Sequence, residues 1–142
     1  MSFKTFKNIN IYFLTILIFL NNSLAGANSQ IGKLKLTEAT INAFYDYISS
    51  DRRRLDKFLV TTDGTGTFTW VCPQTICAPG SERFYTKPCV KLHKGKPCKI
   101  FAMGRKIKLK GLNKLPKNSK IFKQNDSRAE VKEKLELLGF ID

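Results

Sequence analysis

The stretch CVKLHKGKPCKIFAMGRKIKLKG, from Cys89 to Gly111, decides the fold of this chain. It contains two of the four cysteines, followed by two runs whose side chains alternate in the manner of β-strands, 98–103 and 106–110. Gly104 separates the two runs and suits a bend or a bulge. We therefore expect a disulfide-closed loop that leads into two antiparallel strands.

Alternation also assigns the faces of these two strands. In the first strand, Ile100 and Ala102 are expected on one face and Phe101 and Met103 on the other. In the second, the apolar residues Ile107 and Leu109 are expected to point inward, and the lysines to form an outward row: Lys106, Lys108 and Lys110. Such a row of lysines also protects an edge strand from pairing with another chain.

The four cysteines are expected to form two disulfides, because an even number of cysteines is typical of exported domains. Three pairings are possible. We favour Cys72 with Cys77 and Cys89 with Cys98, since each pair closes a short loop. Reduced thiols and zinc binding are the weaker alternatives, and zinc is disfavoured because neither spacing is the tight C-x2-C pattern of zinc knuckles.

The first 27 residues have the three parts of a secretory signal peptide. Lys4 and Lys7 form the positive region, 9–20 is the apolar run, and the small residues 25–27 predict cleavage before Asn28. A retained membrane anchor is the alternative, but it needs about 20 apolar residues. We expect a periplasmic or secreted protein.

Two helices are predicted from apolar residues at helical spacing. The first follows Thr37, a suitable N-cap, and its apolar stripe consists of Ile41, Phe44, Tyr45 and Ile48. The second begins with a capping box, Ser127 and Glu130, and ends at Gly139. Its apolar side is formed by Val131, Leu135 and Leu138.

Residues 57–72 are typical of a β-hairpin, with Asp63-Gly64 at the turn. Phe68 and Trp70 are expected to share one face of the second strand. We interpret them as cover for the core, with an aromatic binding platform as the alternative. After the hairpin, Pro88 argues against an uninterrupted helix before Cys89.

Together these patterns predict an α+β fold, with a small antiparallel sheet of three to five strands packed by the first helix. The expected organisation along the chain is a signal peptide at 1–27, a flexible leader at 28–35, a disulfide-stapled α+β domain at 36–111, a basic linker at 112–125 and a C-terminal helix at 126–142.

The net charge of +14 comes from one segment. Between Arg83 and Asn125 there are fourteen Lys and Arg and no Asp or Glu, whereas basic and acidic residues cancel in the remainder of the chain. We expect an anion-binding face on the part of this segment that follows Cys89: Lys91, Lys94, Lys96, Lys99, Arg105, Lys106, Lys108 and Lys110.

Catalytic chemistry finds little support in the sequence. His93 is the only histidine, and a Cys–His pair would need a free cysteine. We expect His93 to be exposed and without a special role. The aspartates are not paired for acid–base catalysis, so we expect a solvated face of carboxylates: Asp46, Asp51, Asp56 and Asp63. No metal and no cofactor is expected.

The helix, hairpin and cysteine pairs, followed by the motif CVKLHKGKPCKIFAMGRKI, resemble a group of small uncharacterised exported proteins of alphaproteobacteria. In that group a pattern C…G.PC.IFA.GR.I recurs near the end of the domain. The resemblance covers Leu36–Ile107 and implies a fold, but it carries no assigned activity. Where those proteins often continue with an aromatic residue, this chain has KLKGL.

Three functions remain open on the sequence. The first is a binding module whose basic face meets an anionic partner, which would be lipopolysaccharide, another anionic lipid, nucleic acid or an acidic protein. The second is a structural or envelope-stress protein whose charge is incidental. The third, which has the least support, is an enzyme of unrecognised type.

Overall fold

The computed structural model describes residues 34–51, 56–72, 77, 80–109 and 115–142, all within one compact unit, Ile31–Asp142. The predicted signal peptide lies outside the described residues. In the part of the chain that is described, no helix has the length and apolar character needed to cross a membrane.

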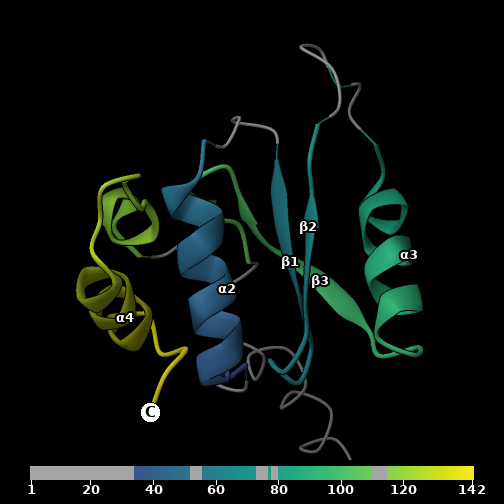
Figure 1. The fold of residues 1–142 in the computed structure, drawn as a ribbon, viewed down its shortest axis with the longest axis horizontal. Helices are drawn as coiled ribbons and strands as arrows, with labels where there is room; N and C mark the ends of the chain where they lie inside the picture. Colours follow the sequence, from purple (N-terminus) through teal and green to yellow (C-terminus); the bar gives the residue numbers. More distant parts are fainter. Residues whose placement is uncertain (1–33, 52–55, 73–76, 78–79, 110–114) are drawn as a thin grey trace, which may run out of the picture. The chain divides into compact units, whose positions relative to one another are not determined.

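The protein has an α+β fold, as predicted, with a four-stranded antiparallel sheet in the order β2-β1-β3-β4. The strands are β1 (Lys57–Thr61), β2 (Thr67–Trp70), β3 (Cys98–Met103) and β4 (Lys106–Ile107). The helices are α2 (Glu38–Ser49), α3 (Glu82–Leu92), the short η2 (Lys117–Lys120) and α4 (Arg128–Leu137). In Figure 1, α2 and α3 flank the strands on opposite sides.

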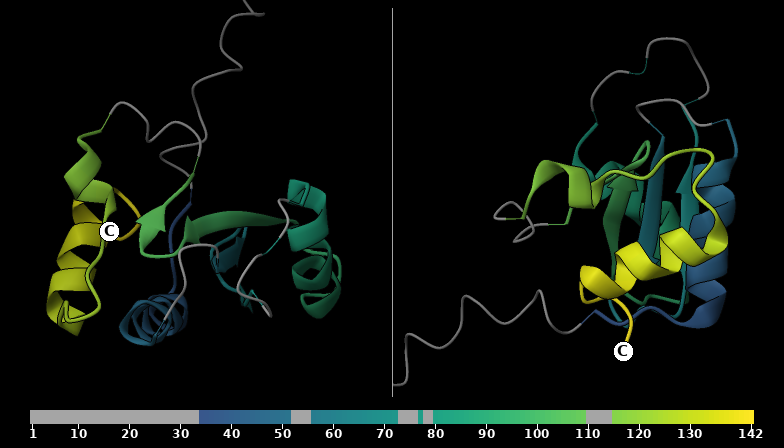
Figure 2. Two further views of the ribbon diagram at one scale, coloured as in Figure 1. Left: turned by 90° about the horizontal axis from the view of Figure 1, so that it is seen from above. Right: turned by 90° about the vertical axis from the view of Figure 1, so that its left-hand side faces the viewer.

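The larger core lies between the sheet and the pair α2 and α4, which lie side by side (Figure 2). Its centre is Phe44, whose ring centroid is 5.1–5.3 Å from those of Phe58, Phe101 and Phe122. Helix α4 closes this core with Val131 and Leu135. Aromatic rings from four separate segments therefore hold the two helices on one face of the sheet.

The smaller core lies on the other face, beneath α3. Leu59 of β1 points to this side, and Tyr85 and Cys89 of α3 cover it. Phe68 and Trp70 share this face and pack against the same cluster, as predicted for core cover.

The prediction that Pro88 prevents an uninterrupted helix is wrong, because α3 runs from Glu82 to Leu92 through Pro88. Proline removes one N–H from the helix and normally destabilises its interior. Here the side chain of Ser81 caps the first turn, and Tyr85 and Cys89 are buried against the sheet. Tertiary burial, together with a disulfide at Cys89, offsets the local cost of Pro88.

The predicted faces of β3 also need correction. Phe58 pairs with Ala102 and Leu59 pairs with Ile100, so Phe101 is an extra residue opposite β1. This β-bulge turns Phe101 and Ala102 to the same, larger core, whereas Ile100 faces the smaller core. Strict alternation therefore fails at Phe101.

Strand β4 is shorter than predicted, although Ile107 is buried and Leu109 packs on the core as expected. Beyond the strand, the N–H of Lys108 still donates to the carbonyl of Phe101 at 2.8 Å. At the outer edge of β4, the N–H of Phe122 donates to the carbonyl of Arg105 at 2.8 Å.

Besides α4, two segments predicted to lie outside the domain 36–111 contribute to its core. Phe122, in the predicted basic linker, is one of the rings around Phe44. Leu34, at the end of the predicted leader, is buried. Two residues later, the N–H of Leu36 donates a hydrogen bond to the carbonyl of Phe140, near the C-terminus, at 2.9 Å. The described parts of both segments thus belong to the packed domain.

Candidate anion-binding surface

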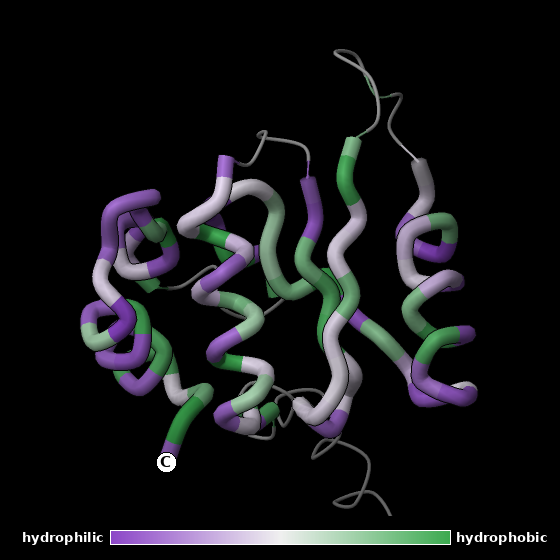
Figure 3. Tube along the Cα trace, in the orientation of Figure 1, coloured by the Kyte–Doolittle hydropathy of each residue, from purple (hydrophilic) through white to green (hydrophobic). Residues whose placement is uncertain are grey.

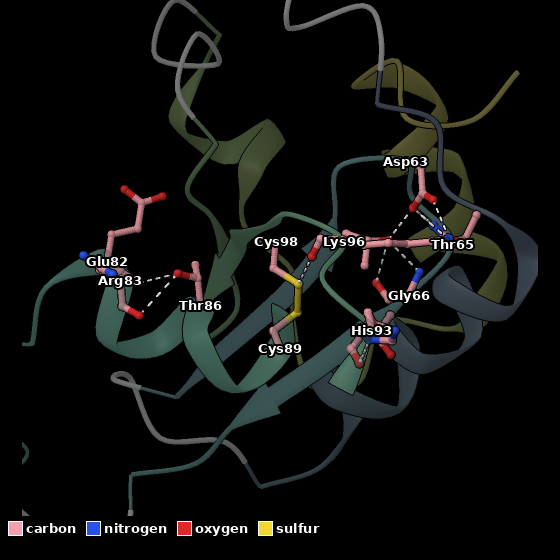
Figure 4. The surroundings of a disulfide bond; sticks show 12 residues. Asp63, Thr65, Gly66, Glu82, Arg83, Thr86, Cys89, His93, Lys96 and Cys98 are labelled. Carbon is pink, nitrogen blue, oxygen red and sulfur yellow. Dashed lines mark hydrogen bonds and ion pairs between the residues drawn. A yellow bond between two sulfur atoms is a disulfide. The ribbon is translucent and has the colours of Figure 1, made fainter. Parts of the chain in front are cut away.

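Both predicted disulfides are confirmed: Cys72 is bonded to Cys77 and Cys89 to Cys98. The second bond joins α3 to the start of β3 across the turn that contains His93 (Figure 4). Within the described residues no cysteine is free, and no three His, Cys, Asp or Glu side chains are grouped as ligands for a metal ion. The stretch from Cys89 to Cys98 is a fixed connection between helix and sheet.

Among the eight predicted anion-binding residues, Arg105 and Lys96 bind other groups of the protein. Arg105 donates from Nε to the carbonyl of Ile48 and from Nη2 to the carbonyl of Ser50, both at 2.8 Å. These carbonyls lie at the C-terminal end of α2, so Arg105 caps that helix. Lys96 forms an ion pair with Asp63, with Nζ 2.8 Å from Oδ2.

Lys99 of β3 does not extend the predicted row of Lys106, Lys108 and Lys110. Lys99 pairs with Val60, which belongs to the larger core. Lys106 pairs with Met103, which is itself paired with Lys57 on the other side of the sheet. Lys99 and Lys106 therefore lie on opposite faces of the sheet. Lys108 is exposed, and Lys110 lies outside the described residues.

A row of exposed basic residues that the sequence did not predict lies along α3. Arg83, Lys87 and Lys91 are four residues apart and all exposed. At about 100° per residue they occupy a sector of roughly 80°, and the buried Tyr85 and Cys89 lie on the opposite side of the helix. We call Arg83, Lys87 and Lys91 the basic row. Hydrophilic residues recur along α3 in Figure 3.

No ion pair neutralises the basic row in the described part of the chain. None of the ion pairs among the described residues involves Arg83, Lys87 or Lys91. The single acidic residue of α3 is Glu82 in the first turn, where it favours the helix dipole. Lys94 follows the end of the helix in an exposed turn, with a positive φ of 52°. The row is therefore a solvated, uncompensated positive surface.

Sequence reasoning found Lys91 and Lys94 but missed Arg83 and Lys87. The signal was present, since Arg83, Lys87 and Lys91 recur every four residues. A helix interrupted at Pro88 would not align these three residues. The helical row exists only because tertiary contacts carry the helix through that residue.

His93 is not the exposed residue that was expected. Its ring is half-buried, and Nε2 donates a hydrogen bond to the carbonyl of Thr67 at 2.9 Å. The ring also lies against Gly66, where an added Cβ would come within 2.5 Å of the ring carbon Cε1. His93 therefore joins the end of α3 to the start of β2 (Figure 4).

The predicted carboxylate face is only partly present. Asp46 and Asp51 are exposed, but Asp56 is 1% exposed and its Oδ1 accepts the N–H of Cys72 at 2.9 Å. The pKa of Asp63 lies well below its usual range, first because Lys96 donates to it and then because Thr61 and Thr65 do so. Both Asp56 and Asp63 thus hold loops in place.

No protein-family model matches this chain, and no curated protein or solved structure matches it either.

Proposed function

We propose that this chain is an exported, non-enzymatic binding module that holds anionic partners of the cell envelope on the basic row of α3. The observation that carries the proposal is the exposed helical row Arg83, Lys87 and Lys91, with no acidic partner among the described residues. Lys94, directly after the end of the helix, extends the same positive field.

The spacing of the row suits an extended charged partner. Residues four apart in a helix lie about 6 Å apart along its axis. That distance is below the Debye length of about 8 Å at physiological salt, so the fields of neighbouring charges add. Binding of this kind depends strongly on salt and little on sequence, because the release of counterions supplies much of the free energy.

Export is supported by two independent features. The first 27 residues have the pattern of a cleaved signal peptide. The domain also holds two disulfides, which persist in oxidising compartments such as the periplasm and the extracellular space. A basic exported domain meets anionic lipids and polymers there.

A binding role is also favoured by how the reactive side chains are used. The sulfur atoms of Cys89 and Cys98 are joined to each other, and the ring of His93 binds a backbone carbonyl. Asp56 accepts the N–H of Cys72, after β2, and Asp63 accepts the N–H of Thr65 in its own turn. We propose no catalytic residue, metal or small-molecule cofactor.

The proposal is tested by titrating the protein with heparin, DNA and lipopolysaccharide, from low to physiological salt. The variant Arg83→Gln/Lys87→Gln/Lys91→Gln removes the basic row. Lys108→Gln/Lys117→Gln/Lys123→Gln removes the same net charge from exposed positions elsewhere and is the matched control. We expect the first variant to lose most of the binding and the control to retain it. Equal affinities for both variants and the wild type, or binding that ignores salt, would reject the proposal.

A further inference from the structure

An exposed apolar row runs along α3 beside the basic row. It consists of Phe84, Pro88 and Leu92, again four residues apart. Phe84 is 59% exposed and Leu92 is 62% exposed. Around the helix, the apolar row lies between the basic row and the buried residues Tyr85 and Cys89. Phe84 and Leu92 lie on one side of the helix, where an exposed apolar patch, unlike a single exposed residue, indicates an interaction site.

The apolar row continues onto the sheet at its Phe84 end. The ring of Trp70 is 6.5 Å from that of Phe84, in an edge-to-face arrangement, and is only half-buried. Phe84 and Trp70 thus form an apolar contact that joins α3 to the end of β2.

The helix that carries both rows is fixed before it meets any partner. The bond between Cys89 and Cys98 joins α3 to β3, and Tyr85 is buried in the smaller core. An isolated helix of this length is marginal in water and would have to fold on binding. Because α3 is already folded, binding costs less conformational entropy.

We propose that α3 docks on the surface of an anionic phospholipid bilayer. Phe84 and Leu92 enter the boundary between headgroups and acyl chains, and Arg83, Lys87 and Lys91 bind the lipid phosphates. An apolar row flanked by basic residues is the pattern of helices that lie in the plane of a membrane interface. Trp70 lies beside Phe84, and tryptophan is favoured at such an interface. This inference rests on the proposed function and names its partner.

The charge and the apolar row together favour a bilayer over a linear polyanion. Heparin or nucleic acid would neutralise the basic row but would leave Phe84 and Leu92 in water. A bilayer surface matches both rows at once, because phosphates and acyl chains lie within one shallow layer. The two rows are adjacent on one helix, so a single orientation of the domain satisfies both.

The experiment measures binding to vesicles of phosphatidylcholine alone and to vesicles that also contain phosphatidylglycerol. Trp70 is the only tryptophan of the chain, so its emission reports contact with lipid. We expect anionic vesicles to shift the emission to shorter wavelengths and to sediment the protein, and neutral vesicles to do neither. Each basic side chain near an anionic surface raises the affinity about fivefold. The variant Arg83→Gln/Lys87→Gln/Lys91→Gln should therefore bind anionic vesicles about a hundredfold more weakly.

The apolar row is tested with Phe84→Ser/Leu92→Ser and, in case Phe84 is needed for folding, with Leu92→Ser alone. The double variant should bind anionic vesicles at least about tenfold more weakly while its heparin affinity stays unchanged. Leu137→Ser, at an exposed position of α4, is the matched control and should bind as the wild type does.

The remaining outcomes distinguish failure of the bilayer proposal from failure of the proposed function. If the wild type binds heparin but Leu92→Ser and the double variant bind vesicles as tightly as the wild type does, the bilayer is rejected and the proposed function stands. Equal binding to neutral and anionic vesicles also rejects the inference. If the wild type binds neither heparin nor anionic vesicles, both proposals fail.

Discussion

His93 and Thr67 are joined by a hydrogen bond from the imidazole Nε2 to the backbone carbonyl, 2.9 Å long, that ties the C-terminal end of α3 to the first residue of β2. A carbonyl can only accept, so Nε2 carries the hydrogen. The single histidine of the chain thus has a structural role, and it holds the helix that carries the basic row.

We expect His93→Ala to lower the free energy of unfolding by about 1–2 kcal/mol, because it removes a half-buried hydrogen bond and the packing on Gly66. Urea denaturation measures this difference. Lys94→Ala, at the exposed neighbouring position, is the control. Equal stability of His93→Ala and the wild type would show that the contact contributes nothing.

Gly66→Ala should destabilise the wild type more than it destabilises the His93→Ala variant. The new Cβ would meet the His93 ring at 2.5–2.9 Å, and this clash disappears once the ring is removed. A double-mutant cycle of unfolding free energies gives the coupling between the two positions. Additive effects of the two substitutions would contradict the close approach of Gly66 and His93.

Arg105→Ala should reduce stability by about 1–3 kcal/mol while leaving heparin binding unchanged. The guanidinium satisfies two carbonyls at the end of α2, of Ile48 and Ser50, which would otherwise lose their charged donor. Denaturation and heparin titration are measured on the same protein, with Lys108→Ala as control. A loss of heparin binding without a loss of stability would show that Arg105 binds anions and does not cap α2.

Asp63 should make folding sensitive to acid. Its pKa is lowered in the folded protein, mainly by the Lys96 hydrogen bond, so the unfolded chain takes up a proton first as pH falls. The stabilisation is complete above the ordinary value of 3.8 and decreases below it. Asp63→Asn should flatten the profile of unfolding free energy in this acidic range, with Asp51→Asn as the control for one lost charge. An unchanged slope in Asp63→Asn would contradict this role.

The full chain should be exported and cut after Ala27, because a positive region, an apolar run and the small residues 25–27 follow one another. The intact mass of the protein recovered from periplasm or medium measures the cleavage position. A recovered protein that still contains residues 1–27 would show that this segment is retained.

The sequence by itself determined the elements whose signals are local. The capping box Ser127–Glu130 is present at the start of α4, and Gly64 and Gly139 adopt the positive φ that their turns require. Cys89 and Cys98 are near enough in sequence for the short loop to favour their pairing. Each of these features depends on residues fewer than ten positions apart, so the pattern and its cause lie in one stretch of chain.

Only the tertiary structure decided that α3 continues through Pro88, that β3 bulges at Phe101 and that Arg105 caps α2. A local rule stops the helix at Pro88, but burial of Tyr85 and the Cys89–Cys98 bond outweigh it, and both depend on a sheet built from distant strands. The same long-range packing aligns Arg83, Lys87 and Lys91 into one row. The sequence therefore showed that the chain is basic, and the packing of α3 on the sheet decided which of its charges face the solvent together.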